Sequence, residues 1–175
     1  MKKFIVTFAT AVALINPGVA LANFGPDGTH VFEGDVDVIK NLPIPTACTL
    51  TVTVVVAGGG TTATATPVLS GATLCNAIQA RAGTFASAPY TVTGSSVVGG
   101  YYTAISLGGV EIQIPPVAFF PADGCLGNLA AAAQLSPGSR TITLTTPTSD
   151  VTDGNPDNFG GTENPCKIEG VLYEI

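Results

Sequence analysis

The sequence predicts an all-β fold, built as a single β-sandwich with an N-terminal extended arm and two disulfides. Valine- and threonine-rich runs with strand-like alternation recur along the chain. No stretch keeps the three-four spacing of an amphipathic helix for more than two turns. Glycine and proline pairs separate the runs at points suited to turns. With 46% hydrophobic residues, the composition is that of a folded protein and not of a disordered one.

The first 22 residues have the three parts of a secretory signal peptide. Lys2 and Lys3 precede an apolar run from Phe4 to Ile15, and Ala20-Leu21-Ala22 forms an A-x-A cleavage site. The apolar run is shorter than the ~20 residues needed to cross a bilayer. We therefore expect a mature chain that starts at Asn23, does not span a membrane, and is secreted to the extracellular space or cell surface of a Gram-negative bacterium.

Residues 23–45 are expected to form the arm, and residues 46–175 the β-sandwich body. The arm starts with a Gly/Pro-rich tip, contains one strand, and ends at Pro43-Ile44-Pro45, which cannot continue a ladder. Val36 and Val38 alternate with aspartates, as a strand inserted into a neighbour's sheet requires. The predicted polymer contacts are Phe32, Val36 and Val38.

Eight strands are expected from the alternation and the turn signals. They are Val31–Ile39, Cys48–Ala57, Thr61–Leu69, Tyr90–Val98, Tyr102–Leu107, Val110–Ile114, Arg140–Thr146 and Lys167–Ile175. The strictly alternating segment Thr49–Val54 is followed by Val55 and Val56, so the end of the run is apolar on both faces. This pattern predicts a strand in the middle of a sheet. Two short helices are expected, Thr73–Arg81 and Leu126–Leu135, the second built around Ala130–Ala133.

The four cysteines predict two disulfides. Cys48, Cys75, Cys125 and Cys166 all follow the signal segment, so export would deliver them to an oxidising compartment. They form no C-x-x-C pair and have no histidine nearby, which argues against a zinc or redox site. Of the three pairings, we favour Cys48 with Cys75 and Cys125 with Cys166.

Charge and motifs exclude several classes of function. From Asn23 onward, four basic side chains stand against twelve acidic ones, so no basic stripe exists to neutralise nucleic acid. The G-x-S-x-G, H-E-x-x-H, P-loop and dinucleotide motifs are absent. The one histidine, His30, is interpreted as a solvated residue of the arm tip. The sequence thus predicts a protein that is not an enzyme and has no cofactor.

One weak calcium candidate lies in the acidic loop of residues 149–165. Asp153, Asn155 and Asp157 stand at alternate positions, as oxygen ligands do in a calcium loop. An EF-hand pattern would require Gly at Asn158 and Glu at Asn164. The alternative is a turn rich in Asn, Asp and Gly for backbone reasons.

The segments around the cysteines carry a family resemblance. Four cysteine-containing segments follow an arm that contains Phe32-x-Gly34. They are Cys48-Thr49-Leu50-Thr51-Val52, Leu74-Cys75-Asn76-Ala77-Ile78, Asp123-Gly124-Cys125-Leu126-Gly127 and Cys166-Lys167-Ile168-Glu169-Gly170-Val171-Leu172. In this order they resemble the small secreted activators of alkane oxidation of the PraB type. The resemblance implies an extracellular or surface-associated protein that is not a hydroxylase, and it brings no catalytic residues.

A second, fold-level likeness is to fimbrial subunits, which suggests an Ig-like or pilin-like sandwich. The leading hypothesis is therefore a secreted structural or adhesive protein, a subunit of an extracellular fibre or biofilm matrix assembled by strand donation. Its partners would be further copies of itself or other cell-surface proteins. The alternative is a secreted, non-enzymatic factor that promotes contact with hydrocarbon or its uptake, through exposed apolar surface such as Val117–Phe120.

Overall fold

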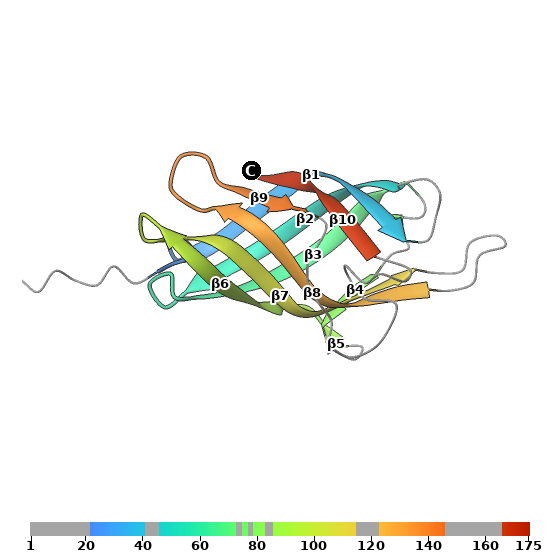
Figure 1. Ribbon diagram of the computed structural model, residues 1–175, viewed down its shortest axis with the longest axis horizontal. Coiled ribbons are helices and arrows are strands. Elements are labelled where there is room, and N and C mark those ends of the chain that lie inside the picture. The colour runs from blue at the N-terminus through green and yellow to red at the C-terminus, as the bar shows by residue number, and fades with distance from the viewer. Residues whose placement is uncertain are drawn as a thin grey trace, which may run out of the picture.

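A computed structural model describes residues 22–40, 46–72, 75–76, 79–82, 86–114, 123–145 and 166–175. Within these ranges the backbone forms ten strands (Figure 1). They are β1 (Gly28–Lys40), β2 (Thr46–Ala57), β3 (Thr62–Gly71), β4 (Gln79–Ala82), β5 (Ala86–Ser87), β6 (Tyr90–Val98), β7 (Tyr101–Ile114), β8 (Asp123–Gln134), β9 (Thr141–Leu144) and β10 (Cys166–Glu174). The predicted all-β class is confirmed, because only Cys75 and Asn76 are helical in the part described.

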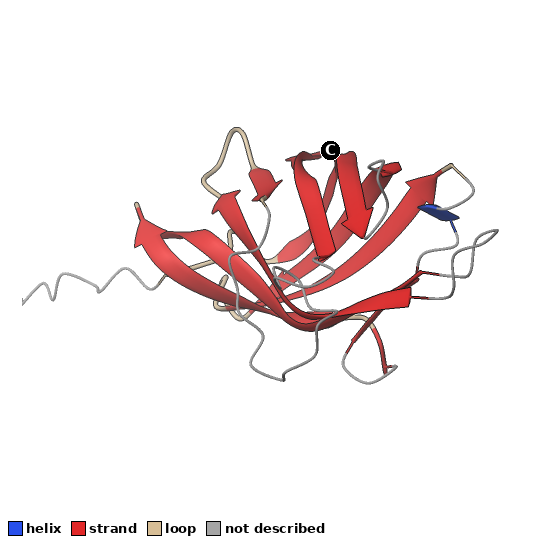
Figure 2. Cartoon of the chain, turned by 45° about the vertical axis from the view of Figure 1, so that its right-hand side comes forward, coloured by secondary structure: helices blue, strands red, loops and turns tan. Residues whose placement is uncertain are grey.

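Eight of the strands form one closed antiparallel barrel. The order around the ring is β1, β2, β3, β6, β7, β8, β9 and β10, and β10 pairs again with β1. Figure 2 shows these strands curving around a common interior. The predicted β-sandwich, Ig-like or pilin-like, is therefore wrong. A sandwich leaves unpaired backbone groups on its outer strands, whereas closure gives every strand of the ring a partner on both sides.

The two remaining strands extend the sheet beside β7. β6 pairs with the first half of β7, from Tyr101 to Leu107, and β4 pairs with the second half, from Val110 to Gln113. β5 pairs with β4. β8 runs along the other side of β7 over both halves, with a register shift between Leu107 and Val110. This irregularity lies at Gly108-Gly109, where the sequence predicts a break between two strands. Instead, one bulged strand runs through both segments.

Alternating residues fill the barrel. On β2, Cys48, Leu50, Val52, Val54 and Val56 are buried, while the residues between them are partly or fully exposed. This period of two turns one side of the strand toward the interior. β2 pairs with β1 on one side and β3 on the other, so its predicted place in the middle of a sheet is confirmed.

β8 is the largest error in the predicted elements. The alanine-rich sequence predicts a helix at Leu126–Leu135, but this stretch lies within β8, apart from Leu135, which directly follows it. Leu129, Ala131 and Ala133 are buried at alternate positions, and β8 pairs with both β7 and β9. Alanine has a high intrinsic helix propensity, but tertiary pairing overrides it here. The predicted helix at Thr73–Arg81 is also wrong for Gln79–Arg81, which lie in β4.

Two glycines allow β1 and β10 to approach closely where the barrel bends. A methyl group on Gly34 would collide with the backbone carbonyl of Val171, and one on Gly170 would collide with the carbonyl of Asp35. The β1–β10 pairing is interrupted at this point, between the pairs Glu33–Tyr173 and Val36–Gly170. Glycine at such a bend lets two backbones come together without a side chain between them.

One predicted disulfide is confirmed. Cys48 on β2 and Cys75 are bonded, with their Cα atoms 5.6 Å apart. Cys75 is completely buried, so the bond ties the segment that follows β3 to the start of β2. The side chains of Cys125 and Cys166 lie outside the described residues, and their pairing stays a prediction.

The arm strand is part of the same barrel. β1 pairs with β2 along Gly28–Val38 and with β10 along most of its length. Phe32, Val36 and Val38, the predicted polymer contacts, are buried in the core of their own chain. Exchange of this strand between chains stays a prediction. In the described ranges, no helix is long and apolar enough to cross a membrane.

Candidate ligand-binding cavity

The barrel encloses an apolar cavity of about 50 Å³. Protein interiors pack densely, and voids larger than a water molecule are few. The cavity is lined by Phe24, Phe32, Leu50, Val52, Val54, Ala65, Pro67, Val92, Ile105, Leu107, Leu129, Ala131, Leu135, Arg140, Ile142, Leu144 and Leu172. Arg140 is the one charged residue of this lining. Cavities lined by apolar side chains are the kind that can hold small apolar molecules in place of water.

The inward positions of all eight barrel strands contribute to the lining. Two small side chains, Ala65 on β3 and Ala131 on β8, line the cavity where the neighbouring strands carry larger residues. Ala131 pairs in register with Ile105 on β7 and Leu144 on β9, both of which line the same cavity. The alanine run that favours a helix in the sequence thus supplies one of the two small residues that line the cavity.

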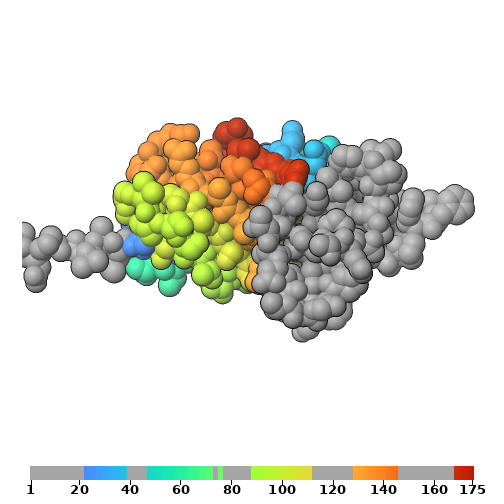
Figure 3. Space-filling model, viewed as in Figure 1, coloured from blue at the N-terminus to red at the C-terminus, as the bar shows by residue number. Residues whose placement is uncertain are grey.

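The segment before β1 closes one end of the barrel. The amide of Phe24 donates to the carbonyl oxygen of Gly60 at 2.8 Å, and that of Asn23 donates to Gly100 at 3.0 Å. The Phe24 ring is buried against the Tyr102 ring, with centroids 4.6 Å apart. In Figures 1 and 3, the β2–β3 turn, the β6–β7 turn and the β8–β9 loop gather at this end of the molecule. Residues 23–25 therefore tie these turns together.

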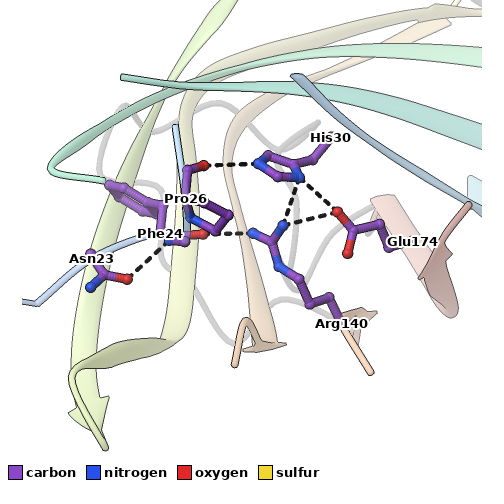
Figure 4. A network of polar contacts seen from close by, with 7 residues as sticks. Asn23, Phe24, Pro26, His30, Arg140 and Glu174 are labelled. Carbon is purple, nitrogen blue, oxygen red and sulfur yellow. Dashed lines mark hydrogen bonds and ion pairs between the residues drawn. The ribbon is translucent and has the colours of Figure 1, made fainter. Parts of the chain in front are cut away.

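A polar cluster lies at the same end (Figure 4). Arg140 directly precedes β9, at the position that continues the inward series of Ile142 and Leu144. Its Nη1 donates to Oε1 of Glu174 at 2.9 Å, and its Nη2 donates to the carbonyl oxygen of Phe24 at 2.7 Å. Its guanidinium carbon lies 5.6 Å from the centre of the Phe32 ring. Only 8% of Arg140 is exposed, so this is a buried cation held by a carboxylate, a carbonyl group and an aromatic ring.

His30 completes the cluster. Nε2 of His30 donates to the carbonyl oxygen of Pro26 at 2.9 Å. Nδ1 lies 2.7 Å from both Nη1 of Arg140 and Oε1 of Glu174; it accepts from Arg140 in the neutral ring and donates to Glu174 in the charged ring. Only 13% of the His30 side chain is exposed. The interpretation of His30 as a solvated tip residue is therefore wrong.

One N–H donor of Arg140 makes no hydrogen bond. Its Nε is buried and has no hydrogen-bond partner among the described residues. An unpaired buried donor costs free energy that a bound acceptor would recover. Less than 1 Å² of this atom is exposed, so the donor does not face open space in the cavity.

No sequence motif marks Arg140 or Glu174 as a functional residue. Arg140-Thr141-Ile142-Thr143-Leu144 alternates, which places Arg140 on the same face as two buried aliphatic residues. A charge in phase with an apolar face was the signal that marked this residue. Its pairing with Glu174 and His30 depends on the barrel and is not visible in the sequence.

Several predicted features fall outside the described residues. These are the calcium candidates Asp153, Asn155 and Asp157, and the apolar patch Val117–Phe120. The described part of the chain holds no group of three or more His, Cys, Asp or Glu side chains suited to a metal ion. The calcium site therefore stays a prediction.

A comparison with protein families decides the family. The model for the PraA/PraB-like alkane oxidation protein activators matches residues 1–173. The chain belongs to this family. The resemblance to PraB-type proteins expected from the cysteine motifs is thereby confirmed. Comparisons with curated proteins and with solved structures found no match. The PraA/PraB-like family is described as activating an oxidation.

Proposed function

We propose that this protein is a secreted, non-enzymatic factor that takes up part of a hydrocarbon chain inside its barrel and so promotes contact with alkanes. The observation that carries the proposal is the apolar cavity enclosed by the eight strands. The family description, an activator of alkane oxidation, agrees with it. Export is supported by the signal-like residues 1–22 and by the Cys48–Cys75 disulfide, since disulfides persist in oxidising compartments.

The driving force would be the hydrophobic effect. Each methylene group that moves from water into an apolar site gains about 0.8 kcal/mol. The cavity of about 50 Å³ is several times the ~10–15 Å³ that a cavity needs to hold one water molecule, so it admits a short segment of chain. A longer alkane would require the aliphatic side chains of the lining to change rotamer.

The structure favours this function over strand donation. A fibre subunit built by strand donation has an arm that is free to enter a neighbour. Here Phe32, Val36 and Val38 fill the interior of their own chain, and β1 already has a partner on each side. No feature of the described residues favours the fibre hypothesis.

A matched pair of variants tests the proposal. Ala131→Val adds two carbon atoms to the cavity wall, whereas Ala132→Val adds them to the exposed face of the same strand. The binding of n-hexane to the purified protein would be measured from its equilibrium vapour concentration above the solution. We expect Ala131→Val to weaken binding about tenfold or more, and Ala132→Val to leave it within about twofold. Equal binding by both variants and the original protein would contradict binding in the cavity.

A further inference from the structure

We infer that Phe24 is the gate of the cavity: a chain enters when the segment Asn23–Asp27 moves away from the end of the barrel, and the segment then closes over the bound chain. This inference rests on the proposed function, because it assumes that a chain binds inside the barrel. It adds the route of entry and the residues that control the rates of entry and exit. Phe24 is itself a lining residue of the cavity, and only 4% of it is exposed.

The side of the cavity away from Phe24 is blocked by packed side chains. On four strands, the next buried side chain beyond a lining residue, in the direction away from the β2–β3 and β6–β7 turns, is only 2% exposed and does not line the cavity. These residues are Val36 on β1, Tyr90 on β6, Val110 on β7 and Ile168 on β10. Densely packed interiors contain few voids larger than a water molecule. A chain that entered from that side would have to displace several buried side chains at once.

The wall of the barrel is an unfavourable route for a different reason. Each strand of the ring is hydrogen-bonded to a neighbour on both sides. A chain that passed between two strands would break several ladder hydrogen bonds and leave their backbone groups unpaired beside an apolar molecule. Entry at the end of the barrel avoids this loss.

The segment Asn23–Asp27 is attached to the barrel much more weakly than a strand. Within the described ranges, its strand-like pairing is one isolated bridge, between Asn23 and Tyr101. The exposed carboxylate of Asp27 accepts from the amides of Gly59 and Gly60, at 3.0 and 2.8 Å, and so anchors the segment to the β2–β3 turn. Segments held by few and partly exposed bonds open locally at a much lower free energy than core strands do.

Side chains from the barrel supply the remaining anchors (Figure 4). Nη2 of Arg140 donates to the carbonyl oxygen of Phe24 at 2.7 Å, and Nε2 of His30 donates to the carbonyl oxygen of Pro26 at 2.9 Å. Arg140 and His30 are therefore positioning residues, which hold the backbone of the segment so that the Phe24 ring covers the cavity.

The test measures how fast n-hexane enters and leaves the barrel. Methyl NMR exchange spectra at partial saturation give the association and dissociation rate constants for the original protein and three variants. Asp27→Ala removes the anchor to the β2–β3 turn and leaves the cavity lining intact. Phe24→Ala removes the ring of the gate. Asp35→Ala is the matched control, because the exposed carboxylate of Asp35 accepts from Thr49 on the outer face of β1 and β2.

The variants should change the rates more than the affinity. Asp27→Ala should raise both rate constants about 3- to 10-fold and leave Kd within about twofold, because a looser gate accelerates entry and exit alike. Phe24→Ala should raise both rate constants further and should also weaken binding, since the ring is part of the lining. Asp35→Ala should leave both rate constants within about twofold of the original values. Asp27 is exposed, so its variant keeps the test informative if Phe24→Ala does not fold.

The outcomes separate the inference from the proposed function. Hexane binding with unchanged rate constants in Asp27→Ala would overturn the inference and leave the proposed function standing. A change in Kd through the dissociation rate alone would also overturn it, because the segment would then act only as part of the wall. Equal acceleration in Asp27→Ala and Asp35→Ala would point to general loosening of the barrel and would overturn it as well. Failure of the original protein to bind hexane would overturn both, whereas faster exchange at an unchanged Kd in Asp27→Ala alone of the two aspartate variants would support the gate.

Discussion

Arg140 and Glu174 face each other between neighbouring strands, with Nη1 of Arg140 2.9 Å from Oε1 of Glu174. The amide of Glu174 also donates to the backbone carbonyl of Arg140 at 3.1 Å. The two residues differ in burial, since 6% of the Arg140 side chain is exposed and 28% of that of Glu174. Removal of Arg140 and removal of Glu174 should therefore lower the free energy of unfolding by different amounts.

Arg140→Met should lower the free energy of unfolding by about 2–4 kcal/mol, because it removes the bonds to both Glu174 and the Phe24 carbonyl. Glu174→Gln should lower the free energy of unfolding by only about 1 kcal/mol, because the amide oxygen can still accept a hydrogen bond from Arg140 and the site is partly solvated. Urea denaturation measures both values. Equal losses would mean that the bond to the Phe24 carbonyl contributes nothing to stability.

Gly34→Ala should destabilise the barrel by about 2 kcal/mol or more, because the added methyl group meets the Val171 carbonyl on β10. Gly108→Ala is the control: its methyl group would come no closer than 3.7 Å to Asn128, so its stability should change by less than about 1 kcal/mol. Thermal melting of the two variants provides the comparison. A Gly34→Ala protein as stable as the control would show that β1 and β10 are not in close contact at this bend.

Replacing Cys48 and Cys75 by alanine together should lower the free energy of unfolding by about 3.5 kcal/mol, the loop-closure contribution for a sequence separation of 27 residues. The Cys125→Ala, Cys166→Ala double variant leaves the confirmed bond intact and measures the contribution of the predicted second bond separately. Denaturation curves under non-reducing conditions give both values. A loss below about 1 kcal/mol in the first variant would contradict a stabilising role for the Cys48–Cys75 bond.

Tyr90 should make stability depend on pH in the alkaline range. Burial raises the pKa of its phenol to about 12 from the usual 10.0, and the nearby Glu111 contributes less. Because the pKa is higher in the folded state, the unfolded state ionises first as pH rises above 10. The folded state should thus lose on the order of 1–2 kcal/mol between pH 10 and about 12.

Tyr90→Phe removes this ionisation. The difference in unfolding free energy between the variant and the original protein should be constant below pH 9 and should then shift in favour of the variant. Parallel pH profiles for both proteins would contradict a raised pKa at Tyr90.

The individual strands could be predicted from the sequence more fully than their arrangement. The Thr49–Val54 alternation identifies β2 and its buried face because the period of two is a local property of the chain. The same alternation suits a sandwich and a barrel alike. Closure depends on the pairing of β1 with β10, whose residues Phe32 and Glu174 are far apart in sequence.

The site was harder to predict than the fold. The alanines around Ala131 favour a helix by propensity, yet in the barrel they form a strand and leave room for the cavity. His30, Arg140 and Glu174 come from three separate segments that meet only after closure. Arg140 itself could have been found, because it stands in phase with the apolar residues Ile142 and Leu144.

The central claim is that a hydrocarbon chain binds inside the barrel and not on its outer surface. The most direct test is a methyl NMR titration with n-hexane. We expect the methyl signals of Leu129, Ile142 and Leu172, which line the cavity, to shift with saturation. The signals of Val68 and Val98, which are 58% and 70% exposed, should stay in place. Shifts at Val68 and Val98 with unchanged signals from the interior would contradict the account.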